Sequence, residues 1–318
     1  MKLVVGFITY NDSSAKYLGD FLPSLRAALA FLPLEERLIF AFDNSSPDNN
    51  FNRLSLEYFI KDNPEELIRL TRNKNLGFSR AYNFMIRQAK KLHADYFLAI
   101  NPDTIMEPDT IQKLLAKISS DPKIASVSPK ILRWDFVRQI KTKQLDSCGL
   151  VLKSGLSFRD LGQGELDEGQ YDTASILGPS GAAALYRLSA LEKIKTNHDY
   201  FDSRFFMYKE DCDLAYRLEK AGFKSRLVAE ALVYHDRTVG SFGQGFWGRF
   251  KERRQLSRQA RAWSFKNQHL LFVKHFWQEN LVSKLLIMSR IIVLFIFSLI
   301  LEQFNLKEYL SIWRSFKA

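Results

Sequence analysis

Cysteine is scarce in this 318-residue chain, which contains only Cys148 and Cys212. Two cysteines cannot make a disulfide framework for a chain of this length, and they do not form a C-x-x-C pair. A reducing compartment is therefore the expected environment. No A-x-A cleavage pattern follows the first apolar stretch, which starts after Lys2 and is broken at Asn11. We expect that stretch to be a first strand and not a signal peptide.

The chain also lacks internal repeats, low-complexity tracts and a long uncharged apolar run. Its uninterrupted C-terminal apolar run, 291–301, is short for a bilayer span, which needs about 20 residues. Acidic residues are the minority: 35 Asp and Glu stand against 46 Lys and Arg, a net charge of +11. This excess favours an anionic partner such as phosphate groups, nucleic acid or acidic lipid. The hydrophobic content of 46%, with 26 Phe, is enough for one large domain and an appendage.

Apolar runs of strand length alternate with helical patterns over the first hundred residues. We predict strands at 3–10, 38–42, 67–70 and 96–100, one helix ending near residue 32 and another at about 79–92. Because these strands are continuously apolar, they fit a parallel sheet covered on both faces, in a doubly wound α/β fold. The catalytic region is expected to span 1–245, and a helical extension 246–318.

Polar residues follow all four predicted strands. In doubly wound sheets, ligands bind beyond the carboxyl ends of the strands, so these residues are candidates for a binding site. They are Thr9, Tyr10, Asn11, Asp43, Asn44, Arg72 and Asn101.

Two strand ends carry a carboxylate. Pro102 cannot continue a strand ladder, so Asp103 is left at the strand's end, where it could bind a divalent cation that bridges two phosphates. Asp43 could accept hydrogen bonds from a ribose or a base. Each also has a plainer explanation, since Asp103 could cap the next helix and Asp43 could form an Asx turn.

A glycine-containing loop leads into a helix at residues 73–83. Its backbone N–H groups and the positive helix end could face an anion, although Ser79 is equally an ordinary N-cap. The segment contains neither GxGxxG nor GxxxxGK[ST], which argues against a dinucleotide dehydrogenase and a P-loop NTPase.

Three carboxylates, those of Glu210, Asp211 and Asp213, stand at the start of a predicted helix that ends near Gly222. An ionised carboxylate there could take a proton from an attacking sugar hydroxyl, or the three could simply complement the helix dipole. His235 ends a later predicted strand, where it could bind a metal or, with Arg237, a diphosphate; it could also be a structural hydrogen-bonding group.

Taken together, the segments ITYND, DNSSPD, NKNLGFSRAYN, NPDT, GPSGAAALYR, FFMYKEDCDLAYRLEKAGF, YH and SFKNQHLLFVKH resemble the family 2 glycosyltransferases of the GT-A fold. The resemblance covers roughly residues 3–274 and is strongest to the branch that contains bacterial rhamnosyltransferases. It implies inverting transfer from a nucleoside diphosphate sugar with Mg²⁺ or Mn²⁺. In this family pattern Asn101 stands where many relatives have an aspartate.

The resemblance also implies roles for individual residues. Asp103 would be the metal ligand, with His235 as an additional metal or diphosphate contact, and Asp211 the general base. Around the nucleotide it implies Thr9, Asn11, Asp43, Gly77 and Asn83, to which the neighbouring Tyr10, Asn44, Arg72 and Asn101 are added. Candidates for contact with the donor sugar or the acceptor are Gly181, Ala182, Tyr208, Glu210, Asp213, Arg237 and Trp247.

The implied reaction leaves several alternatives. dTDP-L-rhamnose is the first choice of donor, with a galactofuranose, hexose or N-acetylhexosamine donor as the alternative, and the acceptor is expected to be a growing, lipid-linked bacterial cell-surface glycan. A catalytically silent nucleotide-binding scaffold in a polysaccharide assembly complex, and a nucleotidyltransferase, are the competing functions.

The C-terminal region is first basic and aromatic, at 249–266, and then apolar, at 281–301, with Lys284 and Arg290 as its only charges. We expect a helix lying in the membrane interface, its basic residues meeting acidic headgroups, on a protein attached to the cytoplasmic face of the cell membrane. The alternative is a helix packed on the domain or on another subunit, which would give a homo-oligomer through the C-terminal helices. No nucleic-acid motif accompanies the basic stretch, so nucleic acid is not an expected partner.

Overall fold

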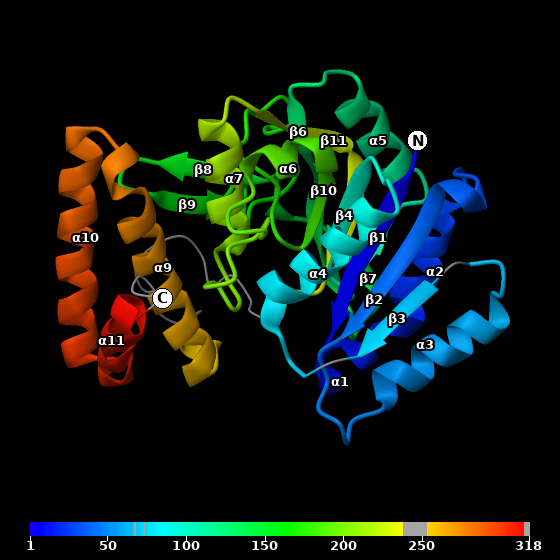
Figure 1. Ribbon diagram of the computed structural model, residues 1–318, viewed down its shortest axis with the longest axis horizontal. Helices are drawn as coiled ribbons and strands as arrows, with labels where there is room; N and C mark the ends of the chain where they lie inside the picture. The colour runs from blue at the N-terminus through cyan, green and yellow to red at the C-terminus, as the bar shows by residue number, and fades with distance from the viewer. Residues whose placement is uncertain (67, 73, 238–252, 315–318) are drawn as a thin grey trace.

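The computed structural model of the protein describes residues 1–66, 68–72, 74–237 and 253–314. Within them, a nine-stranded sheet has the order β3-β2-β1-β4-β10-β6-β11-β5, and β7 pairs with β6 (Figure 1). Its strands are β1 (Leu3–Thr9), β2 (Arg37–Asp43), β3 (Ile68–Arg72), β4 (Tyr96–Ile100), β5 (Thr104–Met106), β6 (Ile124–Asp135), β7 (Ile140–Ser147), β10 (Ala183–Arg187) and β11 (Lys224–His235). A separate hairpin joins β8 (Leu150–Lys153) to β9 (Ser157–Asp160).

The N-terminal half of the sheet is parallel and buried on both faces. Strands β3, β2, β1 and β4 pair in parallel, and every residue of β2 and β4 is buried. One face packs on α2 (Leu18–Leu29), α3 (Phe51–Asp62) and α5 (Thr110–Ser119). The other packs on α4 (Gly77–Lys91), α6 (Leu188–Ile194) and α7 (Glu210–Lys220). This is the doubly wound arrangement that the continuous apolar runs predicted.

The second half of the sheet makes it mixed. Strand β10 lies antiparallel between β4 and β6, while β11 runs parallel to β6 and ends at His235. The predicted helix that ended near residue 32 is two helices, α1 (Asn11–Ala15) and α2. Their separation leaves the first turn after β1 beside the turn after β2.

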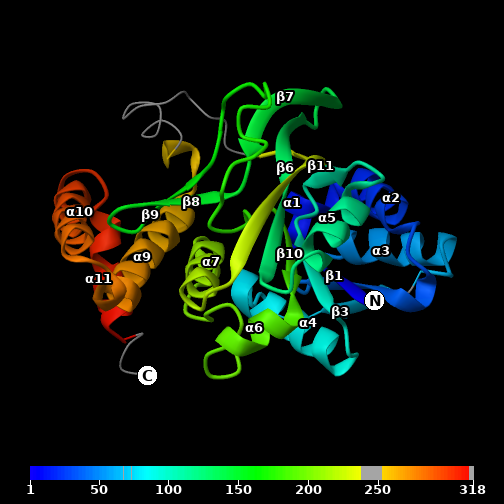
Figure 2. The same cartoon turned by 90° about the horizontal axis from the view of Figure 1, so that it is seen from above.

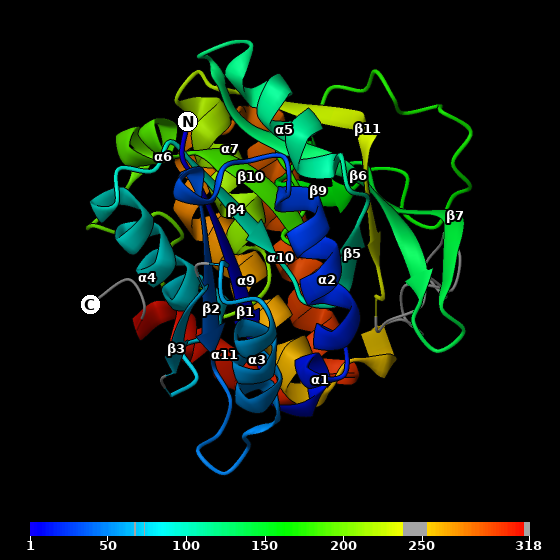
Figure 3. The ribbon, with the colours of Figure 1, turned by 90° about the vertical axis from the view of Figure 1, so that its right-hand side faces the viewer.

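The helices α9 (Arg258–His275), α10 (Leu281–Ile300) and α11 (Leu306–Arg314) form a layer beside α7 and the β8–β9 hairpin (Figures 1 and 2). Seen from the side, α2, α3 and α5 lie in front of the sheet and these C-terminal helices lie behind it (Figure 3). Leu270 and Leu271 of α9 share an apolar cluster with Phe205 and Ala215, and Phe272 packs in a second cluster with Tyr216. The extension therefore shares buried core with the sheet-bearing part of the chain.

Candidate active site

The carboxyl ends of β1 and β2 meet at Thr9 and Asp43, which are direct partners in the parallel register. Thr9 Oγ1 donates a hydrogen bond to Asp43 Oδ1 at 3.0 Å, and the Ser45 backbone N–H donates to the same oxygen at 3.1 Å. The second bond is that of an Asx turn. Both Thr9 and Asp43 are fully buried, so this strand end is a rigid, polar floor.

Three loops are tied together above that floor. Asn11 has a φ of 44°, and its side-chain oxygen accepts a hydrogen bond from the Ser46 backbone N–H at 3.0 Å. Asn44 links the second loop to the third, because its Oδ1 accepts from the Leu76 N–H at 3.0 Å. Gly77, with a φ of +71°, lies so close to the Phe206 carbonyl that a Cβ would be 2.4 Å from its oxygen. Only glycine fits this close approach.

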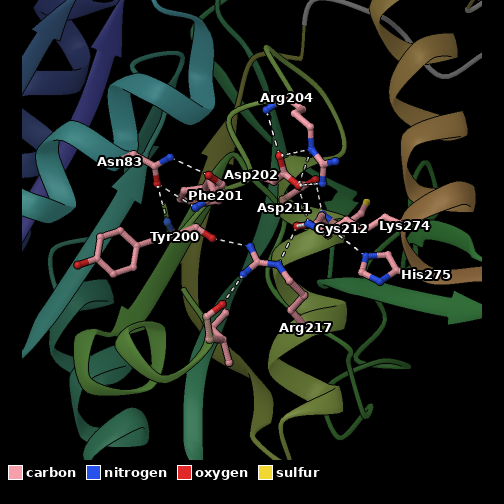
Figure 4. Close-up of polar contacts among 12 residues, drawn as sticks. Asn83, Tyr200, Phe201, Asp202, Arg204, Asp211, Cys212, Arg217, Lys274 and His275 are labelled. Carbon is pink, nitrogen blue, oxygen red and sulfur yellow. Dashed lines mark hydrogen bonds and ion pairs between the residues drawn. The ribbon is translucent and has the colours of Figure 1, made fainter. Parts of the chain in front are cut away.

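The other predicted nucleotide contacts differ in exposure. Tyr10 is exposed, whereas Arg72, which was predicted to follow a strand ending at residue 70, is the last residue of β3. Asn83 is fully buried in α4, where its Nδ2 donates to the Phe201 carbonyl at 2.7 Å and its Oδ1 accepts from the backbone N–H groups of Tyr200 and Phe201 (Figure 4). Asn83 thus joins α4 to the segment 200–201, and its predicted contact with the nucleotide stays a prediction.

Asp103, in the loop after β4, and His235, the last residue of β11, lie side by side. His235 Nε2 lies 3.4 Å from Asp103 Oδ2, and its Nδ1 lies 2.8 Å from Asp146 Oδ2. Burial alone would lower the pKa of His235, but the carboxylates of Asp103 and Asp146 raise it to about 10. Within the described part of the chain, Asp103 Oδ1 is buried without a hydrogen-bond partner. The open oxygen of the Asp103 carboxylate could hold a divalent cation, and His235 could join it as a ligand only in its neutral form, after losing the proton that Asp103 and Asp146 stabilise.

Substrate oxygens would have to complete the coordination of such a cation. Among the described residues, no group of three or more His, Cys, Asp or Glu side chains could hold a metal ion. A cation bound at Asp103 and His235 would have only these two protein ligands, which would leave room in its coordination shell for phosphate oxygens.

Asp146, which contacts Nδ1 of His235, belongs to a network of ion pairs. Asp146 contacts Arg133 Nε and Arg237 Nη1, each at 3.1 Å, and Arg237 Nη2 lies 3.3 Å from Asp160. Burial opposes ionisation of Asp146, but His235 and the two arginines lower its pKa. No motif in the sequence singles out Asp146 or Asp160, because their partners are distant along the chain. Arg237, predicted as a sugar or diphosphate contact, belongs to this network.

Asp211 lies in the first turn of α7, where two backbone N–H groups hold its carboxylate. Gly181 N–H donates to Oδ2 at 2.9 Å, and Cys212 N–H donates to Oδ1 at 2.8 Å. The backbone carbonyl of Ala182, the residue after Gly181, accepts a hydrogen bond from the Asn101 N–H at 2.9 Å. The loop after β4, which carries Asp103, and the start of α7 are thus brought to the same segment, 181–182.

The two acids on either side of Asp211 are buried. Burial, together with the charge of Asp211, raises the pKa of Glu210 well above its usual range. Asp213 is fully buried and contacts the cationic groups Arg217 Nε and Lys274 Nζ and the ring nitrogen Nε2 of His275, each at 2.8 Å. Figure 4 shows Lys274 and His275 of α9 reaching towards α7 beside Arg217. Asp213 therefore joins α7 to α9, and its predicted contact with the donor sugar or the acceptor stays a prediction.

Helix α9 also holds the loop that precedes Asp211. Tyr208 and Lys209 both adopt left-handed conformations, with φ of 74° and 67°. The buried side chain of Asn267 bridges this loop, since its Nδ2 donates to the carbonyls of Met207 and Tyr208 at 2.7 and 2.8 Å. Two successive non-glycine residues with left-handed backbone conformations carry strain, which hydrogen bonds such as those from Asn267 offset. Trp247, another predicted contact, lies outside the described residues.

Comparisons with known proteins add to this geometry. Residues 4–195 match the sequence model of a family described as Glycosyl transferase family 2. The chain is 28% identical over 184 residues to an N-acetylglucosaminyl-diphospho-decaprenol L-rhamnosyltransferase of Mycobacterium tuberculosis, covering 51% of this chain and 56% of the relative. It is 24% identical over 227 residues to poly-beta-1,6-N-acetyl-D-glucosamine synthase of Staphylococcus aureus, covering 71% and 47%. The chain thus spans about half the length of the curated relatives it matches.

Two solved structures have a similar fold. One is GalNAc-T7 with UDP, GalNAc and Mn2+, at a TM-score of 0.54 and 14% identity, covering 74% of this chain and 43% of that one. The other is the mannosyltransferase PcManGT from Pyrobaculum calidifontis in complex with GDP-Man and Mn2+, at a TM-score of 0.54 and 15% identity, covering 99% and 74%. The predicted GT-A type of α/β fold with a C-terminal helical extension is confirmed.

Proposed function

The chain belongs to glycosyl transferase family 2, and from this premise we propose that it transfers a sugar from a nucleoside diphosphate sugar to a hydroxyl group of a glycan. The observation that carries the proposal is the carboxylate of Asp211, which the Gly181 N–H orients at 2.9 Å beside the loop of Asp103. A fixed carboxylate next to a candidate diphosphate site is what an inverting transfer needs.

In this proposal Asp211 is the general base. Its carboxylate accepts the proton of the acceptor hydroxyl as that oxygen attacks the anomeric carbon of the donor, and the nucleoside diphosphate leaves from the opposite side. The hydrogen bonds from Gly181 and Cys212 fix the carboxylate before the acceptor arrives. Such pre-orientation lowers the entropic cost of reaching the transition state.

The donor would bind across the strand ends. Thr9, Asn11 and Asp43 offer the polar floor for the nucleoside, and the diphosphate would extend towards Asp103 and His235. Those two residues would hold a divalent cation, Mg²⁺ or Mn²⁺, which supplies positive charge to the departing diphosphate. The two structures of similar fold were solved with Mn2+, which supports a divalent metal.

We propose dTDP-L-rhamnose as the donor and a lipid-linked, bacterial cell-surface glycan as the acceptor. The rhamnosyltransferase from Mycobacterium tuberculosis supports both, since its name gives the sugar and a decaprenol diphosphate acceptor. Such an acceptor would place the chain at the cytoplasmic face of the cell membrane. The match to a poly-N-acetylglucosamine synthase favours an N-acetylhexosamine donor as the second candidate.

Changing Asp211 to Asn tests the base. We expect Asp211→Asn to lower the rate of transfer about 10²- to 10⁴-fold, because the amide cannot accept the acceptor proton. Nucleotide affinity, measured by titration calorimetry, should stay unchanged, because Asp211 is not among the proposed nucleotide contacts. Glu219→Gln, at the other end of α7, is the matched control and should keep full activity. Wild-type rates in Asp211→Asn would remove it as the base.

A screen of nucleotide sugars with Mg²⁺ and with Mn²⁺ tests the donor. Binding and hydrolysis of dTDP-L-rhamnose in preference to UDP-N-acetylglucosamine is the expected result, and addition of a chelator should abolish both. The reverse preference would favour the second candidate. A chain that binds a nucleotide sugar but transfers and hydrolyses none would instead be a scaffold.

A further inference from the structure

Helix α10 presents an apolar face to solvent along its whole length of 20 residues. Its exposed large apolar side chains are Leu281, Val282, Leu285, Leu286, Met288, Ile292, Val293, Phe295, Ile296, Leu299 and Ile300. At 3.6 residues per turn they cover about half of the helix circumference. Ser283 and Ser298, in contrast, are buried against the protein. The helix is thus inverted relative to a surface helix of a soluble protein, which turns its apolar side inward.

The inner face of α10 is fastened by polar contacts. Two side chains of α10 bind Gly155, in the turn of the β8–β9 hairpin. Ser283 Oγ accepts a hydrogen bond from the Gly155 N–H at 2.8 Å, and the Arg290 guanidinium donates to the Gly155 carbonyl. Just before the helix, Glu279 accepts a hydrogen bond from Tyr216 of α7 at 2.6 Å. Ile287 is fully buried between these contacts.

These attachments bear on how the helix could meet a membrane. By length and composition α10 is, among the described residues, the one helix that could cross a bilayer, with a mean hydropathy of 2.1. Crossing would put lipid around the whole helix, so Ser283 and Arg290 would lose their partners and Arg290 would enter hydrocarbon. Lying flat exposes only the outer half to lipid and keeps every inner contact.

We propose that α10 lies flat in one leaflet of a membrane, with Ile292 and Ile296 at the centre of its inserted face. Its charged residues, Lys284 and Arg290, are both basic, which suits anionic headgroups. Trp277, just before the helix, is 82% exposed, and Lys284 Nζ lies 5.5 Å from its ring centroid. An exposed Trp beside a Lys at the end of an apolar face is an arrangement suited to the interface.

This mode of attachment deepens the membrane location proposed above, and its test needs no sugar donor, so sugar transfer and membrane docking can fail separately. The full chain is sedimented with vesicles of phosphatidylcholine, with and without phosphatidylglycerol. The double variant Ile292→Glu/Ile296→Glu should partition at least about tenfold more weakly, because two charges enter the apolar face. Val137→Glu/Leu166→Glu, which changes two exposed apolar residues elsewhere, should bind like the wild type. Wild-type partitioning of the first variant would overturn the proposal.

Depth measurements separate a flat helix from a spanning one. Single cysteines at positions 281, 292 and 299, all on the outer face, are labelled with a fluorophore and quenched by lipids brominated at shallow or deep carbons. A flat helix predicts the same shallow depth at all three positions. A spanning helix about 30 Å long predicts that only position 292 is deep, and this pattern would overturn the proposal.

A second copy of the chain is the other occupant that this face could take. Sedimentation velocity without lipid distinguishes it from a membrane. A wild-type oligomer that Ile292→Glu/Ile296→Glu dissociates, in a protein that does not bind either vesicle, would overturn the proposal and assign the face to self-association. A monomer that binds vesicles supports it.

Discussion

At the scale of single residues, Asn267 connects the C-terminal helices to the candidate base. Its amide nitrogen donates to two carbonyls of the left-handed loop that ends one residue before Glu210. No other described hydrogen bond from an α9 side chain reaches the 207–209 loop. If Asp211 is the base, Asn267 is a positioning residue that acts through the loop without touching the substrate.

Changing Asn267 to Asp replaces a donor of two hydrogen bonds by a carboxylate that faces two carbonyl oxygens. We expect kcat to fall roughly 10- to 100-fold, because a small displacement of the base is costly, while the KM for the donor stays nearly constant. Steady-state kinetics measures kcat and the KM for the donor, and thermal unfolding checks that the variant is folded. Gln268→Glu is the control, because it makes the same charge change on the next residue, whose amide contacts Leu156 instead. A rise in donor KM with an unchanged kcat would contradict this role.

Local patterns identified some of these residues and missed others. Asp103 and Asp211 could be proposed from the sequence because one follows a predicted strand and the other starts a predicted helix, and their roles stay predictions. Asp146 could not be proposed in this way, since its partner His235 is 89 residues away and the pairing exists only after β6, β7 and β11 have assembled. The contacts of Asp213 with Lys274 and His275 could not be predicted either, because its motif does not reveal which side of α7 faces α9.

At the scale of elements, the seam between α9 and the segment 202–220 is held by two carboxylates, the partly buried Asp202 and the fully buried Asp213, that need their charge. Burial alone would raise the pKa of Asp202, but Arg204 and Lys274 lower it to about 2. Burial likewise opposes ionisation of Asp213, yet His275, Arg217 and Lys274 lower its pKa. Both carboxyls are therefore more acidic in the folded chain than the ordinary value of about 3.9.

The sign of the pH dependence follows from these lowered pKa values. The stabilisation that Asp202 and Asp213 give to the folded chain is complete above about pH 4 to 5. It is lost as the pH falls towards about 2, because their carboxylates bind protons at a higher pH in the unfolded chain than in the folded one. We expect Asp213→Asn to lower the free energy of unfolding at pH 7 by about 3–5 kcal/mol, since the buried cations lose their partner, and to flatten its acid dependence. Urea unfolding at several pH values measures both. Asp109→Asn, whose pair with Lys113 is exposed, should change little.

The elements themselves were predictable where burial and apolar pattern agree. Strand β4 and the helices α4 and α7 lie within about two residues of their predicted positions. Helix α3 had no such pattern, because it buries Asn52 and Leu56 while Phe51 and Tyr58 are exposed. The antiparallel direction of β10 is set by its neighbours β4 and β6, so its own small apolar residues could not predict it.

At the scale of the whole molecule, the expected division at residues 245 and 246 separates parts that share buried surface. Phe272 of α9 packs with Tyr216 of α7, and Leu270 and Leu271 pack with Phe205. The composition change near residue 246 marks the start of the basic segment, but composition does not report which segments pack together. The catalytic part and α9 therefore behave as one folding unit in our interpretation, with α10 on its outside.

Shortening the chain tests that interpretation. A chain ending at residue 245 loses Leu270, Leu271 and Phe272, each worth roughly 1.5–3 kcal/mol when fully buried, and leaves Asp213 without its contacts to Lys274 and His275. We expect it to show no cooperative unfolding transition by circular dichroism. A chain ending at residue 280 keeps α9, Asn267 and Lys274, so it should unfold cooperatively and still bind a nucleotide sugar, but it should no longer sediment with vesicles. Cooperative unfolding and full transfer activity in the chain ending at residue 245 would show that residues 1–245 are an independent domain. Membrane binding by the chain ending at residue 280 would remove α10 as the docking element.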